Sequence, residues 1–581
     1  MRERKGDKSL ENIRHTLAHL LAAAVLEKRP EAKLGIGPTI ENGFYYDFDL
    51  EESLTPEDLP KLEKRIRELI KQDLKVAGNK VTPATARKLF KNQPYKLELI
   101  QDFVKEKKKL TVYKTGEIFS DLCRGGHAKN TKEIDPDAFK LTHLAGAYWK
   151  GGQKNPQLQR VYGVAFTSRT ELDEYLNVAE EAKKRDHKVL GTQLELFMFH
   201  ETAPGSPYWL PRGLTVFNQL VDYWRREHEK RGYQEISSPL VNKKELWITS
   251  GHWEHYQDDM FIADMGEGEI YGVKPMNCPN AMLVFQHKSR SYRDLPLRLS
   301  DSDVLHRYER SGVLNGLLRA RSFRQDDSHN FITEDQIESE YTEIFKIADQ
   351  FYKLFDLKFS YRLGTRPKKF MGEIKIWDRA EKALHKILTQ AVGKDNYFVL
   401  EGDGAFYGPK VDIIMKDSLG RDWQMGTIQL DFQIPQQFGL AYVDKDGKEK
   451  VPVVIHRVIY GSIERFIGIL IEHYAGAFPL WLSPVQVQVI AVSEKFQSYA
   501  QKITQDLRAA GIRTELAEAN ETLGKRIREG ETQKIPYLLI VGERENKEGT
   551  VAVRKRGKGD MGTVTISSLI KSLQEEIAKH S

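Results

Sequence analysis

Residues 303–331 read DVLHRYERSGVLNGLLRARSFRQDDSHNF, and the organisation of the chain can be worked out from this segment. Two β-forming stretches flank a glycine-bearing loop, which predicts two antiparallel strands. Alternate side chains of a strand lie on one face. In the second strand these are Phe323, Gln325, Asp327 and His329. Because the inner face of a core strand is normally aliphatic, this polar row favours a ligand-binding surface over a strand that merely faces solvent.

A second segment, residues 451–473, reads VPVVIHRVIYGSIERFIGILIEH and predicts a strand, a glycine turn and a helix. Arg465 falls in the first turn of that helix. A cation there opposes the helix dipole unless an anion binds nearby, so we predict a phosphate site. The alternative is a surface arginine paired with Glu464 or Glu472.

Cys278, His329 and His456 form a candidate metal site, although they are far apart in the sequence and match no local zinc-finger spacing. Each lies in a segment that we expect to line a cleft. Three protein ligands would leave the fourth position open, as catalytic zinc requires. The alternative is a buried cysteine beside two hydrogen-bonded histidines.

A second candidate cluster lies near the N-terminus, where HTLAH carries His15 and His19 and DLCRGGH carries Cys123 and His127. Histidines four residues apart on a helix can converge on one ligand or water. The glycines beside Cys123 leave room for a substrate backbone. The alternative is that both histidines only pack the helix.

The composition is that of a globular protein, with 581 residues, 40% hydrophobic and 30% charged. A net charge of +6 permits a polyanionic partner without demonstrating one. Only two cysteines occur, which excludes a disulfide framework and favours a reducing, intracellular compartment. We expect neither a secretory signal nor a membrane span.

The pattern of elements predicts three parts. A mixed α+β part begins with a helix over residues 9–28, hairpin strands over 34–50 and a charged helix over 56–75. One long, solvated helix over 171–193 leads onward to a large block of alternating helices and strands. Beyond residue 481, strands separated by crossover helices predict a compact, mostly parallel α/β domain.

The sequence resembles the bacterial threonyl-tRNA synthetases, which are class II aminoacyl-tRNA synthetases, from about Ser9 to the C-terminus. GYQEISSPL resembles motif 1, HRYERSGVLNGLLRARSFRQDDSHNF motif 2 and GSIERFIGIL motif 3. The resemblance extends to further stretches: SGHWEHYQDDMF, KPMNCPN, FYGPKVD, WQMGTIQLDF, HTLAH and DLCRGGH. Most bacterial members begin with a small ubiquitin-like domain, and we expect this chain to lack it.

The resemblance implies an α+β multidomain fold, with an N-terminal α+β editing domain and connector helix (1–185), a class II antiparallel-sheet catalytic core (186–480) and a C-terminal α/β anticodon-binding domain (481–581). It implies a cytoplasmic homodimer that ligates L-threonine to tRNA(Thr) through a threonyl-adenylate and hydrolyses mischarged seryl-tRNA(Thr). The implied cofactors are one Zn²⁺ per subunit and Mg²⁺ with ATP.

Residue roles follow from the resemblance by position. The ATP site would comprise Arg307, Glu309, Arg319, Phe323, Gln424, Thr427 and Arg465, with Gln424 and Thr427 also bordering the amino-acid pocket. Threonine would contact Asp327, Gln325 and Gln429, and zinc would bind Cys278, His329 and His456. Catalytic roles would fall to Arg307, Arg465, Lys410 and His252. Editing would use His15, His19, Asp121, Cys123 and His127, and anticodon binding Glu545 and Arg554.

Two other classes of protein compete with this interpretation. Synthetase-like folds also serve as non-catalytic amino-acid sensors, but such a protein would not need Arg307, Arg319 and Arg465 together with the zinc triad. A free-standing deacylase would not need a class II core larger than its own domain.

Overall fold

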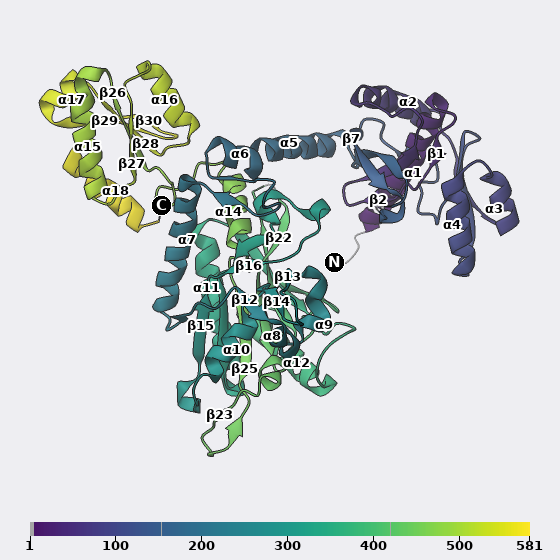
Figure 1. The fold of residues 1–581 in the computed structure, drawn as a ribbon. Coiled ribbons are helices and arrows are strands. Elements are labelled where there is room, and N and C mark those ends of the chain that lie inside the picture. Colours follow the sequence, from purple (N-terminus) through teal and green to yellow (C-terminus); the bar gives the residue numbers. More distant parts are fainter. Residues whose placement is uncertain (1–4, 153, 419, 581) are drawn as a thin grey trace. The chain divides into compact units, whose positions relative to one another are not determined.

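The computed structural model describes residues 5–152, 154–418 and 420–580. The chain forms two compact units, residues 1–181 and 182–581 (Figure 1). Within the described ranges, no helix is both long and apolar enough to cross a bilayer.

The first unit is built on an antiparallel sheet with strand order β1-β3-β8-β7, to which β2 adds by pairing with β3. Leu17, Leu20 and Leu21 of the first helix are fully buried in its core, as the helical spacing predicted. The 34–50 hairpin is confirmed, whereas the helix predicted over 56–75 is a short 3-10 turn followed by α2. The bounds are α1 Lys5–Lys28, β1 Lys33–Leu34, β2 Thr39–Ile40, β3 Gly43–Asp49, α2 Leu59–Lys71, β7 Phe139–Tyr148 and β8 Gln157–Ala165.

The same unit contains a smaller antiparallel sheet with strand order β4-β5-β6. Its two helices pack their apolar residues against it, and Ile100 and Ala86 are fully buried there. The bounds are β4 Val76–Val81, α3 Pro83–Leu89, α4 Pro94–Lys105, β5 Leu110–Thr115 and β6 Phe119–Leu122.

The second unit is centred on an eight-stranded sheet with order β11-β15-β18-β25-β22-β21-β19-β20. Its six inner strands are antiparallel, and only the two edge strands pair in parallel. The predicted antiparallel core is therefore confirmed. The strands are β11 Gln234–Glu235, β15 Leu297–Asp301, β18 Asp327–Ile332, β19 Lys358–Gly364, β20 Tyr397–Leu400, β21 Lys410–Lys416, β22 Asp422–Asp431 and β25 Val453–Val458.

Helices of this unit bury their apolar side chains in one continuous core with the sheet. Trp224, Ile344, Leu384 and Phe466 are among its fully or nearly fully buried members. A small antiparallel sheet, β12-β14-β13, lies beside it. The remaining bounds are α7 Pro211–Glu229, β12 Val241–Lys243, α8 Lys244–Thr249, α9 His252–Tyr256, β13 Ile262–Asp264, β14 Ile270–Val273, α10 Cys278–Gln286, α11 Ile337–Leu354, α12 Ile374–Val392, α13 Ile434–Gln437 and α14 Ile463–His473.

The strand predicted over residues 321–331 is two strands. β17 (Ser322–Arg324) pairs with β16 (Val304–His306), which confirms the antiparallel pair, whereas β18 enters the large sheet. The strand is interrupted between them because the buried Asp326 carboxylate accepts hydrogen bonds from the backbone N–H groups of Ile459 and Gly461, each at 2.9 Å. These partners lie on a segment remote in sequence, so the local pattern could not reveal the break.

The single helix predicted over 171–193 is also two helices, α5 (Arg169–Arg185) and α6 (His187–Gln193). Asp186 has non-helical backbone angles (φ −49°, ψ 121°), and its carboxylate caps α6 by accepting the N–H of Lys188 at 2.8 Å. The prediction of a solvated helix is wrong for α6, where His187 and Leu190 are buried.

The C-terminal part has a five-stranded sheet with order β27-β26-β28-β29-β30, in which the first three strands are parallel. The predicted strands and crossover helices are present. The prediction of a mostly parallel sheet is wrong, because the other two pairings, β28 with β29 and β29 with β30, are antiparallel. The last strand and α17 were not predicted. The bounds are β26 Val487–Ala491, α15 Gln497–Ala509, β27 Thr514–Ala517, α16 Leu523–Thr532, β28 Tyr537–Val541, α17 Glu543–Glu548, β29 Thr550–Lys555, β30 Gly559–Thr565 and α18 Ile566–Ala578.

Candidate active site

A cavity of about 500 Å³ in the second unit is lined by residues of α9, α10, the β16–β17 hairpin, β18, β22, β25 and α14. The sequence predicted many of its lining residues. They are His252, Cys278, Arg307, Glu309, Arg319, Phe323, Gln325, Asp327, Gln424, Thr427, Gln429, His456 and Arg465. His329 and Lys410 do not line it.

The predicted start of α14 is confirmed, with Arg465 in the first turn. Ser462 caps the helix by accepting the N–H of Arg465 at 3.2 Å. Gly461 adopts φ +76° in the preceding turn, where a Cβ would stand 2.3 Å from the carbonyl oxygen of Met425. Only glycine fits this turn. The turn sets the start of α14 and so places Arg465 in the wall of the cavity.

Four arginines line the same cavity: Arg307, Arg319, Arg457 and Arg465. Arg465 donates to the carbonyl oxygens of Leu318 at 2.8 Å and Gln424 at 3.3 Å, rather than to a carboxylate. Burial, and then the positive charges of Arg307 and Arg319, lower the pKa of Arg465. An anion bound against these guanidinium groups would offset their mutual repulsion. The alternative, in which Arg465 pairs with Glu464 or Glu472, is wrong, because the hydrogen bonds of Arg465 go to carbonyl groups.

Aromatic and acidic groups accompany these arginines. The Arg307 guanidinium lies 5.1 Å from the ring centroid of Phe323 and 5.8 Å from that of Tyr256. Glu309 pairs with Arg319, whose Nε donates to it at 2.9 Å. A planar base could stack between such groups while the guanidinium groups hold its phosphates.

A polar network fixes the side chains on β22. The Gln424 amide donates to Asp412 at 2.9 Å and accepts from Arg362 at 2.7 Å. Thr427 donates its hydroxyl to the same Asp412 at 3.0 Å. The Gln429 carbonyl accepts the hydroxyl of Tyr407. These bonds hold the three side chains in defined rotamers along one wall.

Cys278, His329 and His456 converge, with their ligand atoms within 4.8 Å of one another and all three side chains buried. The first residue of α10 supplies the thiol, and the pairing of β18 with β25 places the two histidines opposite each other. Asp431, which the sequence reasoning missed, binds His456 Nε2 at 2.8 Å. It lies two residues beyond Gln429 on β22 and therefore on the same face, which was the available signal.

The open nitrogens of this cluster fit a metal ion. Both ring nitrogens of His329, and Nδ1 of His456, lack a hydrogen-bond partner among the described residues. Each such buried group costs about 1–3 kcal/mol. The alternative of two hydrogen-bonded histidines is therefore wrong for His329. A carboxylate behind a ligating histidine is a common outer-shell arrangement for zinc.

Asp327 borders the same end of the cavity. Asn277 donates to its carboxylate at 3.1 Å, and burial raises its pKa to about 6. It can accept a hydrogen bond from a ligand hydroxyl when ionised.

His252 offers a free ring nitrogen. Its Nδ1 lies 2.8 Å from the Ser250 hydroxyl, which donates to the carbonyl of Leu246 at 3.0 Å. The hydroxyl therefore accepts from Nδ1–H, which leaves Nε2 unprotonated and without a partner among the described residues. Burial lowers the pKa of this histidine to about 3, so the ring is neutral at pH 7.

In the first unit, α1 and the loop after β6 bring together His15, His19, Cys123 and His127, whose ligand atoms also lie within 4.8 Å of one another. Cys123 Sγ is 3.1 Å from His127 Nε2 and 3.6 Å from His15 Nε2. Burial lowers the pKa of His127 to about 2 and raises that of Cys123 to about 12. Burial also lowers the pKa of His15 and His19. The cluster thus contains neutral imidazoles and a thiol at pH 7.

Asp121 contacts the cluster at His19, and two residues that the sequence reasoning missed, Lys96 and Tyr46, hold its carboxylate. Its carboxylate lies 3.8 Å from His19 Nε2, 2.5 Å from Lys96 Nζ and 2.5 Å from the Tyr46 hydroxyl. Lys96 is only 1% exposed. A buried lysine on a charged helix has no distinctive local pattern, so only the packing of α4 reveals it.

Three family models match the chain. They describe the "tRNA synthetase class II core domain (G, H, P, S and T)" at residues 261–474, an "Anticodon binding domain" at 486–576, and the "Threonyl and Alanyl tRNA synthetase second additional domain" at 110–162. The chain is 50% identical over 566 residues to the threonine–tRNA ligase of Caldanaerobacter subterraneus subsp. tengcongensis, covering 97% of this chain and 87% of that one. The chain belongs to the threonyl-tRNA synthetase family.

Two further comparisons agree with membership of the threonyl-tRNA synthetase family. The threonine–tRNA ligase of Carboxydothermus hydrogenoformans is 49% identical over 575 residues, which is 99% of this chain and 90% of that one. A crystal structure titled as the RNA binding domain of threonyl-tRNA synthetase from Cryptosporidium parvum Iowa II superposes with a TM-score of 0.65. It shares 40% identity and covers 67% of this chain and 98% of that one.

Other predicted residues lie away from the two clusters. Lys410 forms ion pairs with Asp403 at 3.0 Å and Asp412 at 3.2 Å. Arg554 on β29 lines a separate cavity of about 300 Å³ in the C-terminal part. Glu545 does not line that cavity, because its carboxylate accepts the N–H of Gly542 at 2.9 Å at the start of α17.

Proposed function

We propose that this protein ligates L-threonine to tRNA(Thr) at the cost of ATP, through a threonyl-adenylate, and hydrolyses mischarged seryl-tRNA(Thr). One observation supports this most strongly: arginines suited to binding phosphate, and Cys278 and His456 of the Cys/His/His cluster, line one cavity of a class II core.

ATP would bind with its phosphates, accompanied by Mg²⁺, on Arg307, Arg319 and Arg465. Its adenine would stack on Phe323, with Glu309 nearby, and Gln424 and Thr427 would border the nucleotide. The lowered pKa of Arg465 supports this assignment, because bound phosphate would relieve the repulsion among the guanidinium groups.

Threonine would bind at the other end of the cavity, beside Asp327, Gln325 and Gln429. Zn²⁺ held by Cys278, His329 and His456 would bind the amino group and the hydroxyl of threonine, which valine lacks. An apolar pocket separates isosteres such as valine and threonine by only about 10²-fold. A site that binds the hydroxyl of threonine therefore discriminates threonine from valine much better.

In the first step, a carboxylate oxygen of threonine attacks the α-phosphorus, and the bond to the β-phosphate breaks to release pyrophosphate. The arginines stabilise the negative charge that develops on the phosphates. In the second step a terminal ribose hydroxyl of tRNA attacks the threonyl carbonyl, and AMP leaves. The unprotonated Nε2 of His252 would accept the hydroxyl proton, and its lack of a partner among the described residues supports this role. Lys410 does not line the cavity, so its catalytic role would be indirect: it pairs with Asp412, which accepts hydrogen bonds from Gln424 and Thr427.

Serine retains both groups that the first site recognises and lacks only a methyl, which is worth about 1–3 kcal/mol. The second cluster would supply the missing discrimination. Neutral His15, His19 and His127 can accept a proton from water that attacks the seryl ester, beside Cys123 and Asp121.

We further propose domain limits of 1–185, 186–480 and 481–581, anticodon contacts by Glu545 and Arg554, and a homodimer. The segment carrying GYQEISSPL supports the dimer, since its last residue, Leu240, and the next one, Val241, are 39% and 51% exposed apolar residues. Both cysteines are free thiols, as expected of a cytoplasmic protein.

Amino-acid-dependent ATP–pyrophosphate exchange tests the proposal. Threonine should support exchange strongly, serine weakly and valine hardly at all, and tRNA(Thr) should be charged with threonine. Equal exchange with valine, or none with threonine, would refute it.

A further inference from the structure

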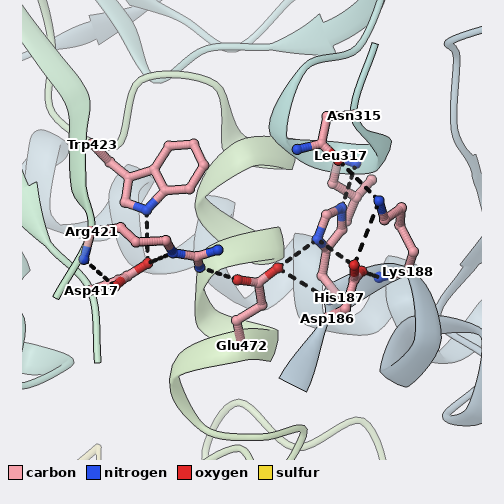
Figure 2. A network of polar contacts seen from close by, with 9 residues as sticks. All are labelled: Asp186, His187, Lys188, Asn315, Leu317, Asp417, Arg421, Trp423 and Glu472. Carbon is pink, nitrogen blue, oxygen red and sulfur yellow. Dashed lines mark hydrogen bonds and ion pairs between the residues drawn. The ribbon is translucent and has the colours of Figure 1, made fainter. Parts of the chain in front are cut away.

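Figure 2 shows a polar network centred on the buried His187 and Glu472, and none of the residues drawn there lines the active-site cavity. The N–H of Leu317 donates to His187 Nε2 at 3.2 Å, so that nitrogen is the unprotonated one. Nδ1 therefore carries the proton and donates to the Glu472 carboxylate at 2.8 Å. The backbone N–H of His187 donates to the same oxygen at 3.2 Å. His187 and Glu472 are 1% and 4% exposed.

The second oxygen of Glu472 is bound as well. It pairs with Arg421, whose Nε also contacts Asp417 at 2.6 Å, and Trp423 donates to that aspartate at 2.8 Å (Figure 2). Asp186, His187 and Glu472 are close enough to suggest a metal site. The histidine nitrogens are instead both used within the protein, so the network is a clamp built of hydrogen bonds.

The network contacts the loop around residues 316–319, part of which lines the cavity at the arginines. Gly316 adopts φ +53° against His187, where a Cβ would stand 2.3 Å from Nε2. One residue beyond Leu317, the Leu318 carbonyl accepts Arg465 Nε at 2.8 Å, and both Leu318 and Arg319 line the cavity. The loop thus joins His187 on one side to the arginines on the other.

We propose that His187 is a positioning residue for ATP. By accepting the Leu317 N–H, His187 fixes the orientation of the Leu318 carbonyl, which accepts a hydrogen bond from Arg465. It also fixes the position of the backbone at Arg319. His187 contacts no substrate itself. The inference rests on the proposed ATP site, and it predicts a defect in ATP use. The threonine end of the cavity is built on α10, β18, β25 and the part of β22 that carries Gln429, and it should be spared.

The test is threonine-dependent exchange by the full chain, measured against ATP and against threonine. His187→Leu removes both hydrogen bonds, and we expect kcat/KM for ATP to fall about 10- to 100-fold, as a misplacement near 1 Å produces. KM for threonine should change less than about twofold. His187→Gln keeps one donor and one acceptor and should recover most of the loss. Val189→Ala, at an exposed position of the same helix, is the matched control.

Gly316→Ala disturbs the same contact from the loop side and should give the same ATP-specific pattern if the leucine variant does not fold. Unchanged ATP parameters, or equal losses for ATP and threonine, would overturn the inference. If the parent protein shows no exchange, the proposed function fails instead. Calorimetric titration with ATP alone then decides the role of His187, because weaker binding in the leucine variant supports it and equal binding overturns it.

Discussion

Replacing Arg465 by alanine should cripple adenylate formation while leaving the fold intact. In the folded protein without ATP, Arg465 donates to two backbone carbonyls, at 2.8 and 3.3 Å. Two hydrogen bonds are worth about 1–3 kcal/mol together. The substitution also removes repulsion from Arg307 and Arg319, which, after burial, lowers the pKa of Arg465. The free energy of unfolding should therefore fall by less than about 2 kcal/mol.

The effect on rate should be much larger. A charge-assisted contact to a transferring phosphate is worth about 2–4 kcal/mol, which is roughly 30- to 1000-fold in rate. ATP–pyrophosphate exchange with saturating threonine measures it, and a denaturant midpoint measures stability. Arg465→Lys is the matched control, since it keeps the charge but not the planar fork, and should be intermediate. An exchange rate within twofold of the parent would refute the phosphate role, and so would a loss of activity that merely follows unfolding.

Three further outcomes are expected. Cys278→Ser should reduce bound zinc, measured by atomic emission from about one ion per chain, and should weaken threonine activation in parallel. Full activity after exhaustive chelation would contradict that assignment. Changing His15 and His19 together to alanine should leave threonine activation unaltered and let seryl-tRNA accumulate. A less stable variant that still clears seryl-tRNA at the parent rate would instead indicate that these histidines only pack the helix. Burial raises the pKa of Glu464 to about 7, so the protein loses stability as pH rises from about 4.5 through 7. Glu464→Gln should therefore match the parent below pH 4.5 and exceed it at pH 8 by up to about 3 kcal/mol in denaturant unfolding. A constant difference across that range would show that Glu464 does not titrate in this way.

Local sequence was sufficient where an element is specified by its own periodicity and caps. The spacing of apolar residues located α1, and Ser462 with Gly461 located the start of α14 and placed Arg465 in its first turn. Helical and strand periods repeat over a few residues, and capping acts within three or four, so a window of the sequence contains the whole signal. The specific motifs of the family likewise lie within single segments.

Only the tertiary structure decided which distant groups meet. Asp326 ends a strand through N–H groups more than 130 residues away. Lys96 and Tyr46 reach Asp121 from separate elements, and both nitrogens of His329 are left open beside Cys278 and His456. These contacts depend on sheet register and on the packing of whole elements, which are set by burial of the entire core. The residues were all visible in the sequence, but their convergence was a consequence of chain folding.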